Sequence, residues 1–271
     1  MKYKSISINE MYNMDEATYL SFLETLDESL NPRTPDLLFD KFRALNPNSK
    51  MKILDAGCRD ARHLCKLAEE YQSKFVGIDL VVSNIEEADK KIKLLDLEDR
   101  IKVQVGDINH LPYDYESIDI IWCRDVLTHM PDLEETFKSF YRVMKSGGRA
   151  LIFHMTGTEL LTEEEARAVS IPVAAYTDNL NPLIFEKAYE SAGFKCIEKD
   201  MIASEWRESY EETGNKMSSK QLLRLAKLIR KKDYYIDKFG EATYQVEVAN
   251  CKYGIYQMLC KLCPIIYTLE K

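Results

Sequence analysis

Short apolar segments alternate with polar, helix-like segments through the middle of the chain. Runs of β-branched and aromatic residues, several with period-two alternation, are typical of strands, and amphipathic stretches such as residues 132–144 are typical of helices. A glycine pair at 147–148 is typical of a helix end. The strand-like segments lie at residues 52–54, 74–78, 101–105, 117–123 and 149–153. This pattern predicts an α/β module.

Acidic residues follow three of these predicted strands. Asp55 ends the first strand and is followed by Gly57, where the chain turns into a helix whose free N–H groups border a nucleotide-sized crevice. Asp79 ends the second strand, at the spacing that suits hydrogen bonds to two ribose hydroxyls. After the third strand, Asp107 can accept from an exocyclic amine and Ile108 can pack on a purine face. The spacing therefore predicts a nucleoside-binding site.

Several short motifs, in order and with matching spacing, carry a resemblance to a known family. They are Leu54-Asp-Ala-Gly57, Val76-Gly-Ile-Asp79, Gly106-Asp107, Asp119-Ile-Ile-Trp122 and Lys145-Ser-Gly-Gly148. This set resembles the sequential motifs of class I S-adenosylmethionine-dependent methyltransferases. Asp125-Val-Leu-Thr-His-Met-Pro131 is similar to an element of the small-molecule branch that includes ubiquinone/menaquinone-type enzymes. The resemblance covers roughly residues 50 to 155.

The resemblance implies a fold, a cofactor and a set of binding residues. The fold would be a doubly wound, mostly parallel, seven-stranded, Rossmann-like α/β sheet, and the cofactor would be S-adenosyl-L-methionine. The residues it assigns to the cofactor are Asp55, Ala56, Gly57, Arg59, Asp79, Leu80, Asp107, Ile108 and Arg124.

The glycine loop departs from the family pattern of Gly-x-Gly-x-Gly. Only Gly57 remains, with Arg59 and Ala61 at the other two positions. Arg59 could instead pair with the cofactor carboxylate or with Asp55. One alternative, a nicotinamide-dependent oxidoreductase, would need a Gly-x-Gly-x-x-Gly loop, which is missing. A second alternative is a degenerate cofactor-binding module. The depleted loop favours it, and retained Asp79 and Asp107 weigh against it.

Length and composition narrow the class of protein. The 271 residues are 45% hydrophobic, enough for one core and an appended part, and the net charge of -8 does not favour a nucleic-acid partner. The sequence after Met1-Lys-Tyr-Lys lacks the apolar stretch that a signal peptide would have. No apolar run in the sequence is long enough to span a membrane. We therefore expect a cytoplasmic protein without stable membrane association.

The cysteine pattern bears on a metal site. The seven cysteines are odd in number and scattered, which favours reduced, mostly packed thiols. Cys260-Lys-Leu-Cys263 leaves a structural zinc site open, but a second such pair and a nearby histidine are missing. We expect no metal.

The chain divides into four predicted parts. Residues 1–48 form an N-terminal helical cover, with one helix expected from Met14 to Leu30, and residues 49–203 form the cofactor-binding core. Residues 204–263 have helical patterning, and residues 264–271 are the final core strand. Because a connection this long is usually functional, we expect residues 204–263 to be a helical lid.

The chemistry expected from the resemblance is methyl transfer. A sulfonium methyl is already activated, so the protein aligns a nucleophile and excludes water, with a base only where the nucleophile is protonated. His129 is the catalytic candidate, although a loop-holding role is equally compatible with its position. Substrate candidates are Tyr12, Tyr19, His154 and Trp206. We predict transfer to nitrogen, oxygen or carbon of a small molecule or short peptide. The acceptor, the oligomeric state and any anionic partner of the basic segment Ser219–Lys232 stay open.

Overall fold

The computed structural model describes residues 5–13 and 15–271, which fall into two compact units, Met1–Pro32 and Arg33–Lys271. The first unit holds α1 (Ile8–Tyr12) and α2 (Glu16–Asp27), whose first turns are capped by the side chains of Ser7 and Asp15. The helix predicted from Met14 to Leu30 is shorter in the structure, where α2 covers Glu16–Asp27. Met14 and residues 1–4 lie outside the described residues.

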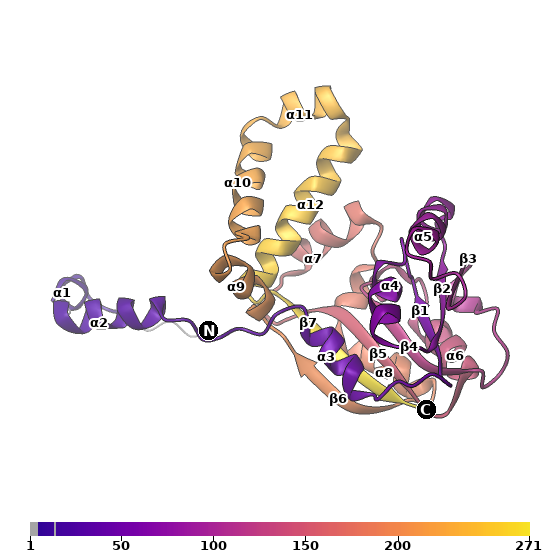
Figure 1. Cartoon of the computed structure of the whole chain (residues 1–271). Helices are drawn as coiled ribbons and strands as arrows, with labels where there is room; N and C mark the ends of the chain where they lie inside the picture. The colour runs from indigo at the N-terminus through magenta and orange to yellow at the C-terminus, as the bar shows by residue number, and fades with distance from the viewer. Residues whose placement is uncertain (1–4, 14) are drawn as a thin grey trace. The chain divides into compact units, whose positions relative to one another are not determined.

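The second unit is built on one seven-stranded sheet of order β3-β2-β1-β4-β5-β7-β6. Only β7 runs antiparallel to its neighbours β5 and β6, and the remaining pairs are parallel. The strands are β1 (Lys52–Ala56), β2 (Lys74–Asp79), β3 (Ile101–Val105), β4 (Ile118–Arg124), β5 (Met144–Gly157), β6 (Lys195–Met201) and β7 (Leu262–Glu270). The predicted doubly wound, mostly parallel sheet is confirmed (Figure 1).

Helices cover both faces of the sheet, and each face has its own apolar cluster. One cluster joins the sheet to α3 (Leu37–Ala44), α4 (Arg62–Glu70), α5 (Val82–Leu94) and α7 (Glu163–Ser170). The other joins it to α6 (Leu133–Val143) and α8 (Pro182–Ser191). Short 3₁₀ turns lie at η1 (Ile108–His110), η2 (Leu127–His129), η3 (Ile171–Val173) and η4 (Thr177–Leu180). The central strands are buried on both faces, which explains their nearly continuous apolar sequence.

The N-terminal segment, predicted to be one part covering residues 1–48, is divided between the two compact units. Helix α3 belongs to the second unit, because Leu38 and Phe42 are 1% and 0% exposed within the sheet cluster. Arg33 begins this unit and forms salt bridges with Asp200 and Glu205 at 2.7 and 2.6 Å. The boundary between the two compact units therefore lies between Pro32 and Arg33.

Four helices lie between β6 and β7, where helical patterning was predicted. They are α9 (Glu205–Glu212), α10 (Met217–Arg230), α11 (Lys232–Phe239) and α12 (Glu241–Met258), called the inserted helices below. Helices α10 and α12 pack side by side, with α11 joining their far ends (Figure 1). Among the described residues, no helix is long and apolar enough to cross a bilayer.

The place of α3 in the core can be tested with two matched phenylalanine substitutions. Phe42→Ala removes a fully buried ring and should lower the free energy of unfolding by about 3–5 kcal/mol. Phe22→Ala removes a ring that is 55% exposed on α2 and should change it by less than about 0.5 kcal/mol. Urea unfolding of both variants measures the difference, and equal effects would contradict the assignment of α3 to the core.

Candidate functional site

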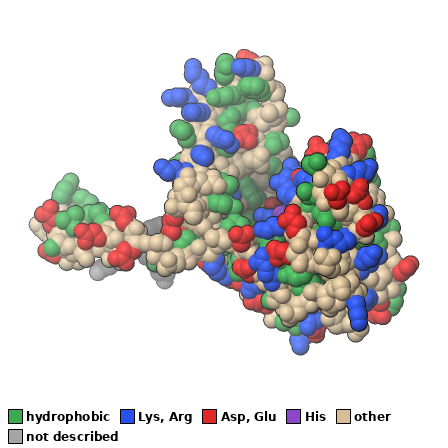
Figure 2. All heavy atoms as spheres, viewed as in Figure 1, with side chains coloured by type: hydrophobic (Ala, Val, Ile, Leu, Met, Phe, Trp, Pro, Cys, Tyr) green, Lys and Arg blue, Asp and Glu red, His purple; other side chains and the backbone are tan. Residues whose placement is uncertain are grey.

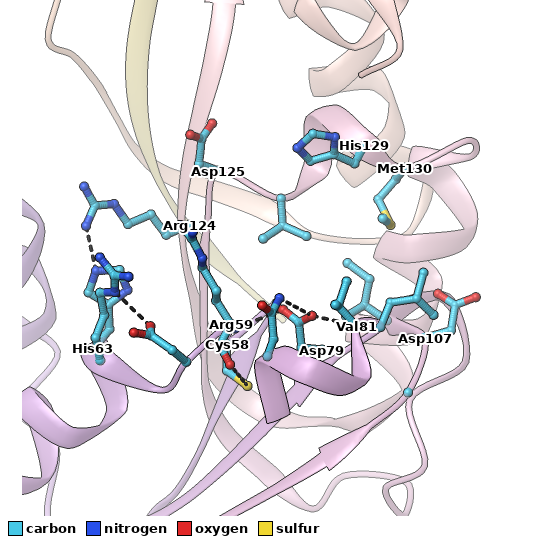
Figure 3. Close-up of a pocket in the computed structure, with 18 residues that line it drawn as sticks. Cys58, Arg59, His63, Asp79, Val81, Asp107, Arg124, Asp125, His129 and Met130 are labelled. Carbon is cyan, nitrogen blue, oxygen red and sulfur yellow. Dashed lines mark hydrogen bonds and ion pairs between the residues drawn. The ribbon is translucent and has the colours of Figure 1, made fainter. Parts of the chain in front are cut away.

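A pocket of about 690 Å³ lies at the carboxyl ends of β1, β2, β3 and β4 (Figure 3). Its volume is in the range of sites for small ligands and cofactors. It also lies between β1 and β4, where the strand order reverses and ligands of open α/β sheets bind. The predicted residues that line it are Gly57, Arg59, Asp79, Leu80, Asp107, Ile108, Arg124 and His129.

The loop after β1 has a backbone shape that favours glycine. Gly57 has φ +85°, and a Cβ there would lie 2.3 Å from Cγ2 of Val126. Arg59 and Ala61 also have positive φ, +48° and +55°. The left-handed conformation costs a non-glycine residue about 1–2 kcal/mol. Arg59 and Ala61 therefore adopt the left-handed backbone conformation of this turn without being glycine, which costs conformational energy.

Asp79 is held rigidly at the pocket wall by three donors. The backbone N–H groups of Arg59 and Val81 donate to its two carboxylate oxygens, each at 2.9 Å, and the side-chain amide of Asn84 donates at 3.0 Å. A carboxylate offers about four acceptor sites, so Asp79 can still accept from a ligand hydroxyl. In the described part of the chain the pairing of Arg59 with Asp55, one of two partners expected for it, is not formed, and Arg59 contacts Asp79 through its backbone N–H.

Asp55 and Ala56 lie beneath the pocket and do not line it. Asp55 is 2% exposed, and its Oδ2 has no hydrogen-bond partner in the described part of the chain. Burial, with a further contribution from the charge of Asp79, raises the pKa of Asp55 to about 8. Asp55 is therefore a neutral acid near pH 7, and the structure gives it no direct contact with a ligand in this pocket.

Arg124 extends from the end of β4 and is held by a neutral partner. Its Nη1 lies 2.7 Å from Nε2 of His63, and its guanidinium lies 5.7 Å from the ring centre of Phe153. Burial and the neighbouring Arg124 lower the pKa of His63 to about 4, so the imidazole is neutral. Because a guanidinium only donates, Nε2 of His63 accepts and the ring proton is on Nδ1.

The wall after β3 provides an acid beside an apolar side chain. The carboxylate of Asp107 accepts from the backbone N–H of Asn109 at 2.9 Å and stays 44% exposed. Ile108 is 4% exposed and packs into the core, and Leu80 across the pocket is 68% exposed. An acid and two apolar groups are thus available to a flat heterocyclic ring.

His129 lines the pocket from η2 and also holds a loop. Its Nδ1 lies 3.1 Å from the carbonyl oxygen of Ala174. Since a carbonyl only accepts, Nδ1 carries the proton and Nε2 keeps its lone pair. The two roles predicted for His129 are therefore compatible, because they use different ring nitrogens.

Two of the predicted substrate residues, His154 and Trp206, are buried and do not line the pocket. His154 is fully buried, donates from Nε2 to the carbonyl of Asn179 at 2.8 Å and stacks on Phe185. Trp206 is buried and stacks on Phe153 at 5.1 Å. Tyr12 and Tyr19 belong to the first compact unit, where their side chains are exposed.

Asp125 lines the pocket although the sequence analysis did not single it out. It has φ +57° and remains accessible to solvent, and partial removal of water by the surrounding protein raises its pKa. The available signal was its position directly after β4, the same kind of position that Asp79 holds after β2.

Comparison with known proteins bears on this pocket. Residues 47–214 match a family model described as a methyltransferase domain. Over 111 residues the chain is 31% identical to methyltransferase GfsG of Streptomyces halstedii, covering 41% of this chain and 40% of that protein. The chain spans less than half the length of the first curated relatives it matches.

Two solved structures share the fold. Phosphoethanolamine N-methyltransferase 2 of Haemonchus contortus, with phosphomonomethylethanolamine and S-adenosylhomocysteine, superposes with a TM-score of 0.66 at 19% identity, covering 90% of this chain and 54% of that one. The cyclase SpnF superposes with a TM-score of 0.68 at 18% identity, covering 90% and 84%. At these identities the likeness concerns the fold alone.

The buried acid beneath the pocket makes stability depend on pH. A raised folded-state pKa means that Asp55 contributes stability below about pH 4, its unfolded value, and loses it as pH rises to about 8. Asp55→Asn removes this proton. Its stability relative to the wild type should rise by roughly 1.4 kcal/mol per pH unit across that window. Urea unfolding at pH 5 and pH 7 measures the two differences, and a constant difference would show that Asp55 is ionised in the fold.

Proposed function

Because the chain belongs to the class I S-adenosylmethionine-dependent methyltransferases, we propose that it transfers a methyl group to a small acceptor bound between the sheet and the inserted helices. The observation that carries the proposal is the position of Asp79 and Asp107 on the walls of one pocket at the β1–β4 switch point. The cofactor supplies a sulfonium methyl that needs no further activation.

The described residues fit a nucleoside cofactor. Asp79 has acceptor capacity for ribose hydroxyls, and Asp107 with Ile108 can take an adenine edge and face. Gly57 lines the pocket, and its lack of a Cβ lets Val126 pack against the loop. Arg124 and Arg59 line the same pocket and are available to a carboxylate. Asp55 and Ala56, also expected at the cofactor, support the loop from beneath.

The acceptor is proposed to be small because the inserted helices stand next to the pocket. Trp206 of α9 stacks on Phe153, and Phe153 in turn lies under the guanidinium of Arg124. This contact joins the inserted helices to the pocket wall, as expected of a lid. The substrate role expected of Tyr12 and Tyr19 stays a prediction.

In this proposal the protein contributes alignment and proton transfer. Nε2 of His129 faces an acceptor whose nucleophile is protonated and takes its proton, while the bond from Nδ1 to Ala174 keeps the ring in place. Asp125, accessible on the same wall, attracts a positively charged acceptor or intermediate.

The alternatives weighed from the sequence differ in what they would bind. The family match is to methyltransferases, so a nicotinamide-dependent reaction has no support beyond the general sheet architecture. A degenerate module would retain the cofactor without turnover. Since SpnF, a cyclase, shares the fold, the fold alone does not decide the reaction and turnover has to be measured.

Cofactor binding is tested by calorimetry with S-adenosylhomocysteine, with NAD as the parallel ligand. We expect micromolar binding of S-adenosylhomocysteine only. Asp79→Ala removes hydrogen bonds to a charged acceptor and should weaken binding by about 10- to 100-fold. Asp89→Ala, on the exposed face of α5, is the matched control and should bind as the wild type does. Equal affinity in the two variants would place the ribose elsewhere.

The role of His129 is tested with a variant that separates its two nitrogens. His129→Asn keeps a donor near the position of Nδ1, so the bond to Ala174 can form, and it removes Nε2. With an acceptor found by screening, kcat should fall by about 100-fold or more while the affinity for S-adenosylhomocysteine stays unchanged. Near-normal turnover in this variant would leave His129 with the loop-holding role only.

A further inference from the structure

Arg207, on α9, is oriented by two neutral amide groups from different helices. Its Nε donates to Oε1 of Gln257 on α12 at 2.9 Å, and its Nη1 donates to Oε1 of Gln221 on α10 at 3.0 Å. Among residues 5–13 and 15–271, no hydrogen bond leaves its Nη2 and no carboxylate forms a salt bridge with it. The side chain is thus fixed in direction without a directly paired carboxylate.

Two other partly buried arginines of this chain have carboxylate partners, unlike Arg207. Arg33 has two carboxylate partners, and Arg149 pairs with Glu270 at 2.5 Å. Arg207 has none, although Glu211 lies one turn further along α9, because the Glu211 carboxylate accepts from Ser218 and Ser219. A half-buried charge without a counter-ion is costly, and burial lowers the pKa of Arg207. Such a group gains most from an external anion.

The packing of the inserted helices is adapted to this arrangement. Gly254 of α12 lies against the amide of Gln221, and a Cβ at that position would fall 1.8 Å from Gln221 Oε1. Glycine inside a helix costs about 1 kcal/mol relative to alanine. The absence of a side chain at 254 is what allows Gln221 to reach Arg207 from α10.

Arg207 does not line the pocket, but it is on α9, the inserted helix that contacts the pocket wall through Trp206. The adjacent residue, Trp206, stacks on Phe153 beneath Arg124. The pKa of Tyr253, on α12, is affected by the charges of both residues: Asp125 of the pocket wall raises this pKa and Arg207 lowers it. Figure 2 shows the surface hollowed between the helices α10 and α12 and the body of the sheet unit.

The charges around this space define what would fit. Arg124 is held by neutral His63 as Arg207 is held by neutral glutamines, and the charge of Arg124 acts on the carboxyl of Asp125. With Arg124 and Arg59 assigned to the cofactor carboxylate, Arg207 is a further cation, on the side of the inserted helices, for the acceptor. A guanidinium with a free Nη2 matches the planar donor geometry that carboxylate and phosphate oxygens accept.

We propose that Arg207 is a specificity-determining residue that binds an anionic group, phosphate or carboxylate, of the methyl acceptor. This inference rests on the proposed function. The acceptor then carries its nucleophile toward His129 and its anion toward the inserted helices. Gln221 and Gln257 are positioning residues, since they act through Arg207.

The test is calorimetric titration of the full chain, saturated with S-adenosylhomocysteine, at constant ionic strength. The probes are inorganic phosphate and acetate, which distinguish the two sources of negative charge. We expect the wild type to bind one of them with a millimolar Kd. Arg207→Gln should weaken that binding about tenfold or more, and Arg230→Gln, the same charge change on exposed α10, should leave it unchanged.

A second variant separates positioning from folding. Gln221→Leu keeps the charge of Arg207 but removes one of the two side-chain oxygens that accept its hydrogen bonds. We expect several-fold weaker anion binding with unchanged affinity for S-adenosylhomocysteine. Failure of the wild type to bind either probe, or equal binding in Arg207→Gln, would overturn the inference. Because saturation with S-adenosylhomocysteine is measured first, failure at that step instead contradicts the proposed function.

Discussion

The close approach of two loops at Gly57 and Val126 is the constraint on which the site depends. The loops after β1 and β4 leave neighbouring strands at the point where strand order reverses, and they can meet only if residue 57 has no side chain. The N–H groups of Gly57 and Cys58 both donate to the carbonyl of Ile78, which ties this loop to the end of β2. Asp79 follows directly and is held by the same loop. One backbone contact thus sets the position of the acid that we assign to ribose.

The electrostatics of the site follow a common rule. Its two partly buried guanidinium groups, Arg124 and Arg207, are held by neutral nitrogen or oxygen acceptors, whereas Asp79 is held by neutral donors. A neutral partner fixes the direction of a charged side chain without cancelling its charge. Arg124, Arg207 and Asp79 can therefore still bind a ligand group of opposite charge or polarity. The exception is Asp55, which burial keeps protonated beneath the pocket floor and which therefore adds no charge to it near neutral pH.

Side-chain direction explains why some predictions did not place residues in the pocket. His154 was expected at the end of a strand covering residues 149–153, but β5 continues to Gly157 because β7 pairs with it from Arg149 to Gly157. His154 is therefore inside the sheet and packs on Phe185. Trp206 was expected at the substrate, but its ring stacks on Phe153. No local pattern separates these outcomes, because they depend on strands and helices far apart in the sequence.

The amino-acid sequence by itself determined the positions of β1 to β4, the acids at the ends of β1, β2 and β3, and the helical character of the segment between β6 and β7. These features are local: periodicity, strand-ending acids and helix-forming stretches act over a few residues. The tertiary structure alone decided that α3 belongs to the core, that Asp55 lies under the pocket and not in it, and that Asp125 lines it. It also decided that Gln221, Gly254 and Gln257 meet Arg207. Burial and charge pairing arise only when separate elements pack, so no single segment of the sequence contains them.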